Sequence, residues 1–426
     1  MQRREWMIRS AAAAGVLAGM VGCATGRGAP AKAQVLVVGG GYGGATAARY
    51  IRLFSRNTVD VVLVEPNRSF VSCPISNLVV GGVRTLADIT TSYDGLRDRH
   101  GITVVHDTVT AVDAERRSVR LAGGGDIRYD TLVLSPGVEL LLDAVQGLRQ
   151  ANADGQVLHA WKAGAETAAL FHQLQAMPDG GVFALAIPEA PYRCPPGPYE
   201  RASMVAAYLQ KNKPRSKVLV VDANQDVTSK GPLFKKAWAD LYPGMLEYRS
   251  QHKLVGVDLP NRTLRFDFQD PVKADVLNVI PPMRAGALAV QTGLANANAR
   301  WCHVDFLNFE STAAPGIHVL GDSIQVAPAM PKSGHMANNQ AKVAAAAIVA
   351  RIKGLAVNTQ PMLTNTCYSF VSPGEVIHVA SVHAYVAAEK TFKAVAGSGG
   401  VSAARSEQEA RYALAWARNI WADTLG

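Results

Sequence analysis

The apolar positions between residues 34 and 139 form short runs that are separated by turns and by one helical segment. The run QVLVV is followed by the glycine turn GGGYGG and by a segment in which small residues recur at helical spacing. The segment TVDVVLVEPN is a second, β-branched run that ends at Glu65, and YDTLVLSPGVE is a third. Continuous apolar runs of this length are typical of strands that a parallel sheet buries on both faces. The pattern therefore predicts a βαβ unit at the start of this region.

The same order of elements returns further along the chain. The segment GGVFALAIPEAPYRCPPGPYERASMVAAYLQKN contains an apolar run, a proline-rich turn and a helix, and SKVLVVDAN follows as the next strand. After KADVLNVIPPMRAG we expect a return to the first unit through PGIHVLGDS and the alanine-rich helix GHMANNQAKVAAAAIVARIKG. The tail from about residue 356 has short β-branched runs and a final amphipathic helix. Two α/β units and a smaller C-terminal unit are therefore predicted.

The composition agrees with a folded chain of more than one domain. Of 426 residues, 48% are hydrophobic and 18% are charged, which excludes a disordered or coiled-coil protein. The formal net charge is +9, but no Lys/Arg tract with interleaved aromatic residues occurs, so nucleic-acid binding is not expected. A mild positive excess is compatible with association with an acidic protein partner.

Residues 1–33 are predicted to be an export signal. RREWMIR contains an arginine pair followed by aromatic and aliphatic residues, and SAAAAGVLAGMVG is too short and too rich in Ala and Gly to span a membrane. The pattern resembles a twin-arginine (Tat) signal, which implies a periplasmic protein that folds around its cofactor before export. The segment AKA before Gln34 fits a cleavage site, and the alternative is a lipid anchor at Cys23.

The glycine turn carries a dinucleotide-binding pattern. Gly39, Gly41 and Gly44 form GxGxxG between a strand and a helix, where they allow a tight turn, a close approach of a pyrophosphate and close packing of helix on strand. Glu65 at the end of the next strand is placed to accept hydrogen bonds from ribose hydroxyls. These four residues are the candidate nucleotide-binding set.

A second segment indicates which dinucleotide is bound. APGIHVLGDS resembles the second flavin motif of two-dinucleotide flavoproteins, in which the aspartate, here Asp322, bonds the ribityl chain of FAD. A dehydrogenase that binds NAD alone has no need of this motif, so FAD is the predicted cofactor. The helix that follows Ser333 is expected to point its positive amino end at the flavin.

The turn of the second α/β unit lacks what a nicotinamide cofactor would need. Its prolines are Pro188, Pro191, Pro195, Pro196 and Pro198, and proline has no N–H to donate to a phosphate. We therefore expect no NAD(P)H binding in the second unit, so electrons must come from a small substrate.

The cysteines contain no CxxC, no CxxCH and no metal-ligand spacing, so neither a metal site nor c-type haem is expected in this chain. Cys194 and Cys367 each lie among proline or aromatic residues, in predicted turns, and from the pattern alone they are either a disulfide or two buried small hydrophobic residues. Cys302, in an alternating segment, is predicted to be a core thiol.

Several segments together resemble the flavoprotein subunit of flavocytochrome c sulfide dehydrogenase. They are GGGYGGATAARYI, EPN and SCPISN, HAWKAG, YRCPPGPYERAS, KADVLNVIPP, MPKSGHMANNQAKVAAAA and LTNTCYS, and they extend over nearly the whole chain after residue 33. The segment MPKSGHMANN adds Lys332 to the cofactor-binding candidates. One position departs from the family pattern, since this chain has Pro74 where a tyrosine is expected.

The resemblance implies roles for further residues. Cys73 would carry FAD through a thioether to the flavin 8α carbon, and Cys194 and Cys367 would form a redox-active disulfide above the flavin. Glu200 is a candidate acid or base, and Trp416 either lines the site or packs between domains. Sulfide would be oxidised to zero-valent sulfur or polysulfide, and the electrons would pass through FAD to a haem c in a cytochrome subunit.

The resemblance also implies an α/β fold of the glutathione-reductase type. It has two Rossmann-type domains, the second degenerate, and an α+β interface domain. The predicted boundaries are 34–148 with 287–355 for FAD, 149–286 for the NAD-like domain and 356–426 for the interface domain. Two alternatives are kept: a sulfide:quinone oxidoreductase, and a flavin-bearing accessory protein of a sulfur-oxidation complex that does not turn over.

Overall fold

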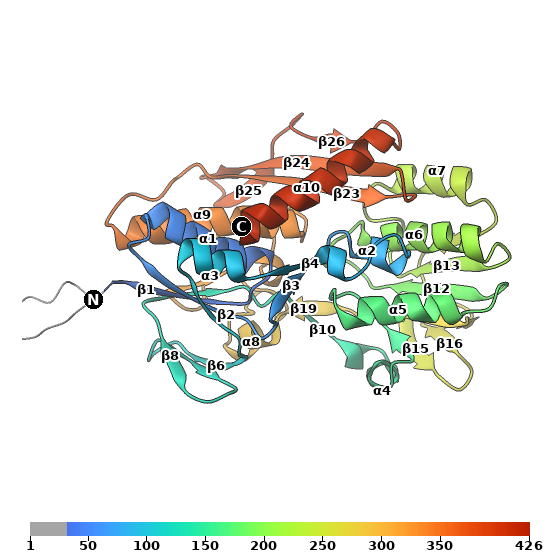
Figure 1. Ribbon diagram of the computed structural model, residues 1–426, viewed down its shortest axis with the longest axis horizontal. Helices are drawn as coiled ribbons and strands as arrows, with labels where there is room; N and C mark the ends of the chain where they lie inside the picture. The colour runs from blue at the N-terminus through green and yellow to red at the C-terminus, as the bar shows by residue number, and fades with distance from the viewer. Residues whose placement is uncertain (1–31) are drawn as a thin grey trace, which may run out of the picture. The chain divides into compact units, whose positions relative to one another are not determined.

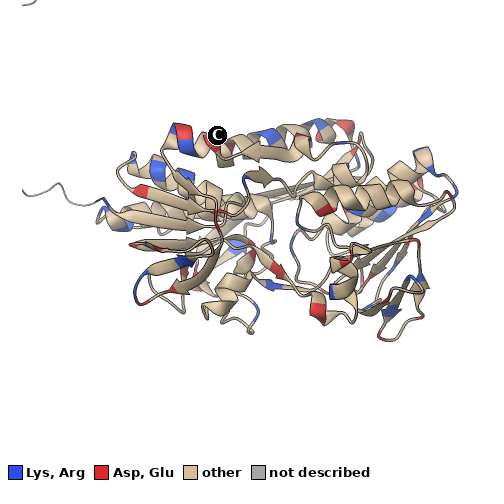
Figure 2. Ribbon diagram, turned by 60° about the horizontal axis from the view of Figure 1, so that its bottom comes forward, with Lys and Arg blue, Asp and Glu red and all other residues tan. Residues whose placement is uncertain are grey.

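The computed structural model describes residues 32–426. The predicted export signal and the lipid anchor at Cys23 lie outside the described residues, so both stay predictions. Within the described residues, Lys and Arg are interspersed with Asp and Glu over the ribbon (Figure 2). Among the same residues, no helix combines the length and the apolar character needed to cross a bilayer.

The first apolar runs form the centre of a sheet. In the described part of the chain its seven strands lie in the order β20 (Val304–Asp305), β21 (Glu310–Ser311), β22 (Ile317–Val319), β9 (Thr131–Leu134), β1 (Gln34–Val38), β2 (Asp60–Val64) and β5 (Thr103–Val105). The strands from β22 to β5 are parallel, and the core strands are buried on both faces as their apolar runs predict. The predicted return of the chain is confirmed, since β22 lies beside β9.

Two helices from distant parts of the sequence pack together beside this sheet. They are α1 (Tyr42–Ser55) and α9 (Gly334–Ile352), which lie side by side in Figure 1. Their contact uses small buried residues such as Ala45, Ala48, Ala341 and Ala344, which allow the helix axes to approach closely. This packing brings the glycine turn before α1 close to the start of α9.

Smaller elements surround the first sheet. They are the pair β3 (Ser69–Val71) and β4 (Thr90–Ser92), the three-stranded sheet β6 (Val109–Asp113), β7 (Ser118–Leu121) and β8 (Asp126–Arg128), the helices α2 (Ser76–Val80), α3 (Asp94–His100) and α8 (Ala287–Gln291), and the 3-10 turns η1 (Ala87–Ile89), η2 (Leu142–Ala144) and η3 (Gly321–Ser323). The strands β10 (Val138–Leu140) and β19 (Met283–Ala285) pair where the chain leaves and re-enters this region.

The second α/β unit is a parallel sheet in the order β11 (Val157–Leu158), β18 (Val276–Val279), β12 (Val182–Ile187), β13 (Lys217–Asp222) and β14 (Leu246–Arg249). Its helices are α4 (Leu148–Ala153), α5 (Ala165–Ala176), α6 (Gly197–Asn212) and α7 (Gly231–Leu241). An antiparallel sheet of β15 (Leu254–Asp258), β16 (Thr263–Phe266) and β17 (Val272–Lys273) lies beyond them. The order β12–α6–β13 repeats β1–α1–β2, with the proline-rich turn in place of the glycine turn.

The C-terminal unit is a short antiparallel sheet and one helix. The strands are β23 (Met362–Phe370), β24 (Val376–Val386), β25 (Thr391–Ala394) and β26 (Gly400–Val401), and the helix is α10 (Glu407–Leu425). Figure 1 shows α10 running along β23 and β24, with its end beside α1. The amphipathic pattern explains this placement, because Ala413 and Ala417 are buried against the sheet.

The two parallel-sheet units and the C-terminal unit of sheet and helix confirm the predicted α/β fold class. The residue boundaries that we predicted between its domains stay predictions.

Candidate active site

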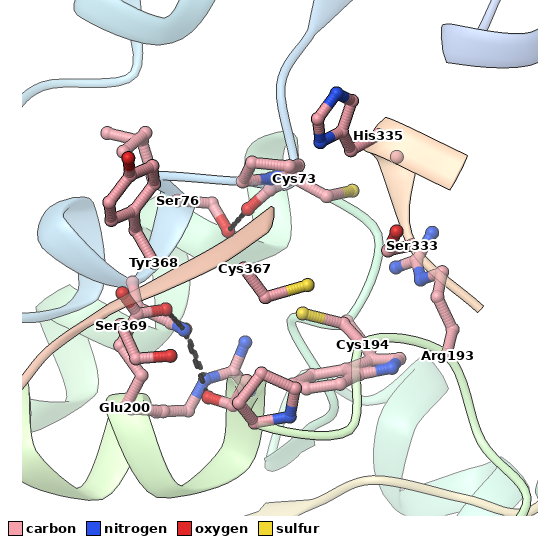
Figure 3. Close-up of a pocket in the computed structure, with 18 of the residues that line it drawn as sticks. Cys73, Ser76, Arg193, Cys194, Glu200, Ser333, His335, Cys367, Tyr368 and Ser369 are labelled. Atoms are coloured by element: carbon pink, nitrogen blue, oxygen red, sulfur yellow. Dashed lines mark hydrogen bonds between the residues drawn. The ribbon is translucent and has the colours of Figure 1, made fainter. Parts of the chain in front are cut away.

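One cavity brings together five of the predicted site residues. Cys73 precedes α2, Cys194 and Glu200 flank the start of α6, Cys367 lies on β23 and Trp416 on α10, and all five line the cavity. Figure 3 shows the sulfurs of Cys194 and Cys367 pointing toward each other. The segments that meet here belong to all three units of the fold.

The backbone around Cys194 leaves room for its sulfur. Cys194 has a left-handed conformation with φ of 57°, and its N–H donates to the carbonyl of Lys332 at 2.8 Å. Gly197 closes the turn by donating to the Cys194 carbonyl at 2.8 Å. A Cβ on Gly197 would lie 2.9 Å from Cys194 Sγ and 2.8 Å from the Trp161 ring, so glycine is needed at this position.

Cys367 lies in the middle of strand β23, where it pairs with Val379 of β24. The predicted turn at this residue is wrong, because pairing with a long neighbouring strand holds the segment extended. Asn365 Nδ2 donates to Cys367 Sγ at 3.4 Å. Both Cys194 and Cys367 are free thiols in the structure, so their disulfide stays a prediction.

The two thiols differ in their electrostatic surroundings. Burial raises the pKa of the Cys194 thiol, and the neighbouring Cys367 and Glu200 raise it further. Burial also raises the pKa of Cys367, but Lys230 and the side chain of Asn365 oppose this effect. Lys230 and Asn365 therefore favour a negative charge on Cys367, whereas Arg193 favours one on Cys194.

Glu200 is a buried carboxyl group that connects α6 to β23. Its Oε1 accepts from the N–H of Phe370 at 2.9 Å, and its Oε2 accepts from Asn77 Nδ2 at 2.7 Å. Burial raises the pKa of this carboxyl, although these two donors act in the opposite direction. A carboxyl group with a raised pKa is suited to hold or release a proton inside the cavity.

Cys73 and Trp416 close other sides of the cavity. The Cys73 carbonyl accepts from Ser76 Oγ at 2.6 Å, and its sulfur accepts from the N–H of Ala163 at 3.4 Å. Trp416 packs against the rings of His335 and Tyr368, with centroids 5.7 and 6.3 Å apart. Cys302 lies outside the cavity in the core, fully buried, and the roles proposed for Cys73 and Trp416 stay predictions.

The glycine turn has the geometry of a dinucleotide cradle. Gly39 has φ of 98°, and a Cβ on it would lie 2.4 Å from the carbonyl oxygen of Ser135. A Cβ on Gly44 would lie 1.8 Å from the Gly39 carbonyl oxygen, whereas a Cβ on Gly41 would meet no described atom within 4 Å. Gly41 is also the N-cap of α1 without a side-chain cap. The space and the backbone donors that a pyrophosphate requires are therefore present.

Glu65 supports this turn directly. Its Oε2 accepts from the N–H of Gly40 at 2.6 Å, and its Oε1 accepts from the backbone and side-chain nitrogens of Asn67 at 2.9 and 2.6 Å. A carboxylate oxygen can accept a second hydrogen bond, so Oε2 can still accept one from a ribose hydroxyl.

Asp322 and Lys332 lie at the end of β22 and before α9. Asp322 Oδ1 is buried and has no hydrogen-bond partner among the described residues, which points to a donor supplied by a ligand. Lys332 Nζ donates to the carbonyls of Asp322 and Ile324 at 2.9 and 2.5 Å and lies over the Trp301 ring. Burial lowers the pKa of Lys332 to about 7. The open cradle and the unpaired carboxylate fit FAD.

Sequence reasoning missed three cations near the cysteine pair, of which Arg201 and Lys230 are buried and Arg193 is partly buried. They are Arg193 and Arg201, which line the cavity, and Lys230, which donates to the Cys367 carbonyl. The pattern gave no signal for them, because isolated basic residues in polar segments are normally exposed. Residues 32–426 contain no group of three His, Cys, Asp or Glu side chains placed to share a metal ion.

Three family models match the chain. "Sulfide dehydrogenase [flavocytochrome c] flavoprotein chain, central" matches residues 167–281, "Flavocytochrome c sulphide dehydrogenase, flavin-binding" matches 359–425, and "Pyridine nucleotide-disulphide oxidoreductase" matches 33–173. The second of these shows that the C-terminal unit is a flavin-binding region of its family.

Curated relatives carry related names. The flavoprotein chain of sulfide dehydrogenase (flavocytochrome c) of Chlorobaculum thiosulfatiphilum is 52% identical over 46 residues, which is 11% of this chain and 94% of that sequence. The mitochondrial sulfide:quinone oxidoreductase of Dictyostelium discoideum is 27% identical over 300 residues, which is 68% of this chain. The match spans 65% of that relative, slightly less than two thirds of its length.

Solved structures show the same fold. The sulfide:quinone oxidoreductase of Aquifex aeolicus aligns with a TM-score of 0.77 at 16% identity, over 92% of this chain and 91% of the other. Putidaredoxin reductase, in its covalent complex with putidaredoxin, aligns with a TM-score of 0.64 at 18% identity, over 82% and 81%. The family models and the Chlorobaculum relative show that the chain belongs to the family of flavocytochrome c sulfide dehydrogenase flavoprotein chains.

Proposed function

We propose that this protein oxidises sulfide with the Cys194–Cys367 pair and FAD, and passes the electrons to a c-type cytochrome partner. The observation that carries the proposal is the position of the two sulfurs, which face each other inside the cavity (Figure 3). Two such cysteines can alternate between a disulfide and a dithiol, and a sulfide anion is a competent nucleophile toward a disulfide.

The chain's own groups account for the sulfur chemistry. Hydrosulfide attacks one sulfur of the disulfide, the S–S bond breaks, and a cysteine persulfide and one cysteine thiolate are formed. Attack of a second hydrosulfide on the outer sulfur of the persulfide releases a disulfane anion and leaves the pair reduced. Glu200 is proposed to hold the proton that hydrosulfide loses, since its carboxyl lines the cavity and burial raises its pKa.

FAD is proposed to be held by the glycine turn at Gly39–Gly44, by Glu65 and by Asp322, with Lys332 beside Asp322. When bound, it supplies an acceptor for the two electrons of the reduced pair and a donor of single electrons to a haem. The amino end of α9, capped by Ser333, contributes its positive dipole at the cavity wall.

Covalent attachment of the flavin at Cys73 is part of the proposal. Cys73 lines the same cavity as the cysteine pair, and it follows Glu65 in the sequence. Acid precipitation of the wild-type holoprotein should give a yellow pellet, and Cys73→Ala should leave the flavin in the supernatant. Cys302→Ala, in the core away from the cavity, is the matched control and should keep a yellow pellet. A colourless wild-type pellet would reject the thioether while leaving FAD binding intact.

The electron acceptor distinguishes this proposal from a second candidate, a sulfide:quinone oxidoreductase. That candidate is favoured by the names of the Dictyostelium and Aquifex proteins to which this chain is similar. With sulfide as donor, we expect steady-state turnover with an oxidised c-type cytochrome and none with a short-chain ubiquinone. Turnover with the quinone alone would contradict a cytochrome as the electron acceptor and would favour the second candidate.

A further inference from the structure

Lys230 places a buried ammonium group directly behind Cys367. The residue precedes α7, has φ of 57° and is 8% exposed. Its Nζ donates to the Cys367 carbonyl at 2.9 Å, to Ser369 Oγ at 2.7 Å and to the Ile377 carbonyl at 3.4 Å. The ammonium therefore joins β23 and β24 at the position of the reactive cysteine.

The acceptors of Lys230 are all neutral. No carboxylate of the described residues forms an ion pair with its ammonium. The next two lysines along the chain, both on α7, are paired: Lys235 with Asp226 at 2.6 Å and Lys236 with Asp240 at 3.0 Å. A buried charge without a paired counter-charge is costly, and burial lowers the pKa of Lys230 to about 8. A hydrogen-bonding role alone would not require a cation here.

The missing counter-charge can come from sulfur. When the pair is opened by reduction or by a nucleophile, one sulfur carries a negative charge inside the cavity. On the Cys367 side, Asn365 Nδ2 donates to the sulfur at 3.4 Å, and the Lys230 ammonium, which contacts the Cys367 carbonyl, attracts a negative charge on that sulfur. The Glu200 carboxyl opposes a negative charge on either sulfur, whereas the cations differ: Lys230 favours a negative charge on Cys367 and Arg193 favours one on Cys194.

We propose that Lys230 is a positioning residue that balances the negative charge on the Cys367 sulfur whenever the cysteine pair is open. The sulfide substrate of that pair rests on the proposed function, but the coupling between Lys230 and Cys367 does not. Figure 3 shows Ser369, which Nζ contacts, on the same strand as Cys367 and close to Glu200.

Other titratable groups face this pair from every neighbouring element, and the test must separate Lys230 from them. They are Cys73 before α2, Cys194 and Arg193 before α6, Glu200 and Arg201 on α6, His335 on α9, Tyr368 on β23 and Glu409 on α10. A substitution at position 230 leaves all of these groups in place, so a change in the pH dependence of Cys367 reactivity can be attributed to the Lys230 ammonium.

The test measures the acidity of Cys367 without sulfide turnover. The flavin-loaded protein is reduced with a phosphine and alkylated with iodoacetamide over a range of pH, and the modified Cys367 peptide is quantified by mass spectrometry. At neutral pH, Lys230→Gln should slow alkylation of Cys367 about three- to tenfold. A rise of one pKa unit lowers the thiolate fraction tenfold, and the more basic thiolate that remains is intrinsically more reactive.

The charge, and not the size of the side chain, should decide the result. Lys230→Arg should stay within about threefold of the wild type, since the charge is kept. Lys236→Gln, on the exposed side of the same helix, is the matched control and should leave the profile unchanged. The difference in the rate of Cys367 alkylation between wild type and Lys230→Gln should become smaller as the pH rises through the pKa of Lys230, about 8, because the wild-type ammonium then loses its proton. Superimposable profiles for wild type and Lys230→Gln would overturn the proposal.

A second measurement uses the wild type alone, so the proposal stays testable if Lys230→Gln does not fold. With less iodoacetamide than protein, Cys367 should be labelled in preference to Cys194 at neutral pH. Equal labelling, or preferential labelling of Cys194, would overturn the assignment of the charge to Cys367. Failure of sulfide turnover with both alkylation results as predicted would reject the proposed function and leave the Lys230–Cys367 coupling standing.

Discussion

At the glycine turn, three glycines are required for three different physical reasons. Gly39 adopts a positive φ beside the Ser135 carbonyl, and Gly44 lets α1 pack against the Gly39 carbonyl. Gly41 is different, because its φ of −72° suits any residue and a Cβ there would meet no described atom within 4 Å. The protein's own packing therefore does not require Gly41, and we propose that the ligand does.

This difference gives a test of the cofactor site that does not depend on activity. Gly41→Ala should fold with a free energy of unfolding within about 0.5 kcal/mol of the wild-type apoprotein, as for an unobstructed surface change. Its affinity for flavin should fall about tenfold or more, which corresponds to about 1.4 kcal/mol of steric conflict with the pyrophosphate. Urea denaturation and the flavin content of the purified protein measure the two effects.

Gly44→Ala is the matched comparison for Gly41→Ala. Its Cβ would lie 1.8 Å from a backbone oxygen, so this variant should lose stability as well as flavin. A Gly41→Ala protein with wild-type flavin affinity would show that no ligand approaches this glycine.

The sequence alone predicted these glycine roles, because GxGxxG between a strand and a helix has a defined geometry. The sequence alone did not predict that Lys230 and Arg201 are buried near the cysteine pair. Their burial results from contacts with residues far away in the chain: Lys230 with Cys367 and Arg201 with the carbonyl of His159. A pattern of neighbouring residues does not indicate contacts between segments that lie this far apart in the chain.

At the scale of elements, the turn between β12 and α6 shows why the second unit differs from the first. Pro196 is the N-cap of α6 and Pro198 lies in its first turn. Because proline has no backbone N–H, neither position can donate a hydrogen bond to a phosphate. The N–H of Gly197 is already used by the Cys194 carbonyl at 2.8 Å. The helix end that would hold a pyrophosphate in a nicotinamide site holds a cysteine instead.

We therefore predict that NADH and NADPH do not reduce the flavin. An anaerobic titration with excess NADH should leave the absorption band of the oxidised flavin unchanged, and dithionite should bleach it in the same sample. Stoichiometric bleaching by NADH would mean that another part of the second unit binds the nucleotide.

The central strands of both parallel sheets followed from their apolar runs, but the shorter outer strands and β23 did not. Its central segment TNTCYS is mostly polar, and the prediction placed Cys367 in a turn. The strand exists because it pairs along its whole length with β24 and because Lys230 and Glu200 bind it from the second unit. Tertiary contacts of this kind override local preference.

At the scale of the whole molecule, the cavity depends on how three units meet. Cys73 comes from the first unit, Cys194 from the crossover of the second, and Cys367 from the C-terminal sheet. Only the family resemblance connected these residues in advance, because spacings of more than a hundred residues carry no geometric information. The structure adds the face-to-face position of Cys194 and Cys367 (Figure 3).

The central claim is that sulfide reacts with this cysteine pair, and the most direct test is anaerobic rapid mixing of the flavin-loaded protein with sulfide. The absorbance of the oxidised flavin is followed in the wild type, in Cys194→Ser, in Cys367→Ser and in the double variant, with Cys302→Ala as the control. The wild type and the control should bleach at the same rate. Each single variant should keep its flavin and bleach slower by roughly two orders of magnitude or more, and the double variant should be no slower than either, since the two sulfurs act as one unit. Bleaching of Cys194→Ser or Cys367→Ser at the wild-type rate would contradict the account.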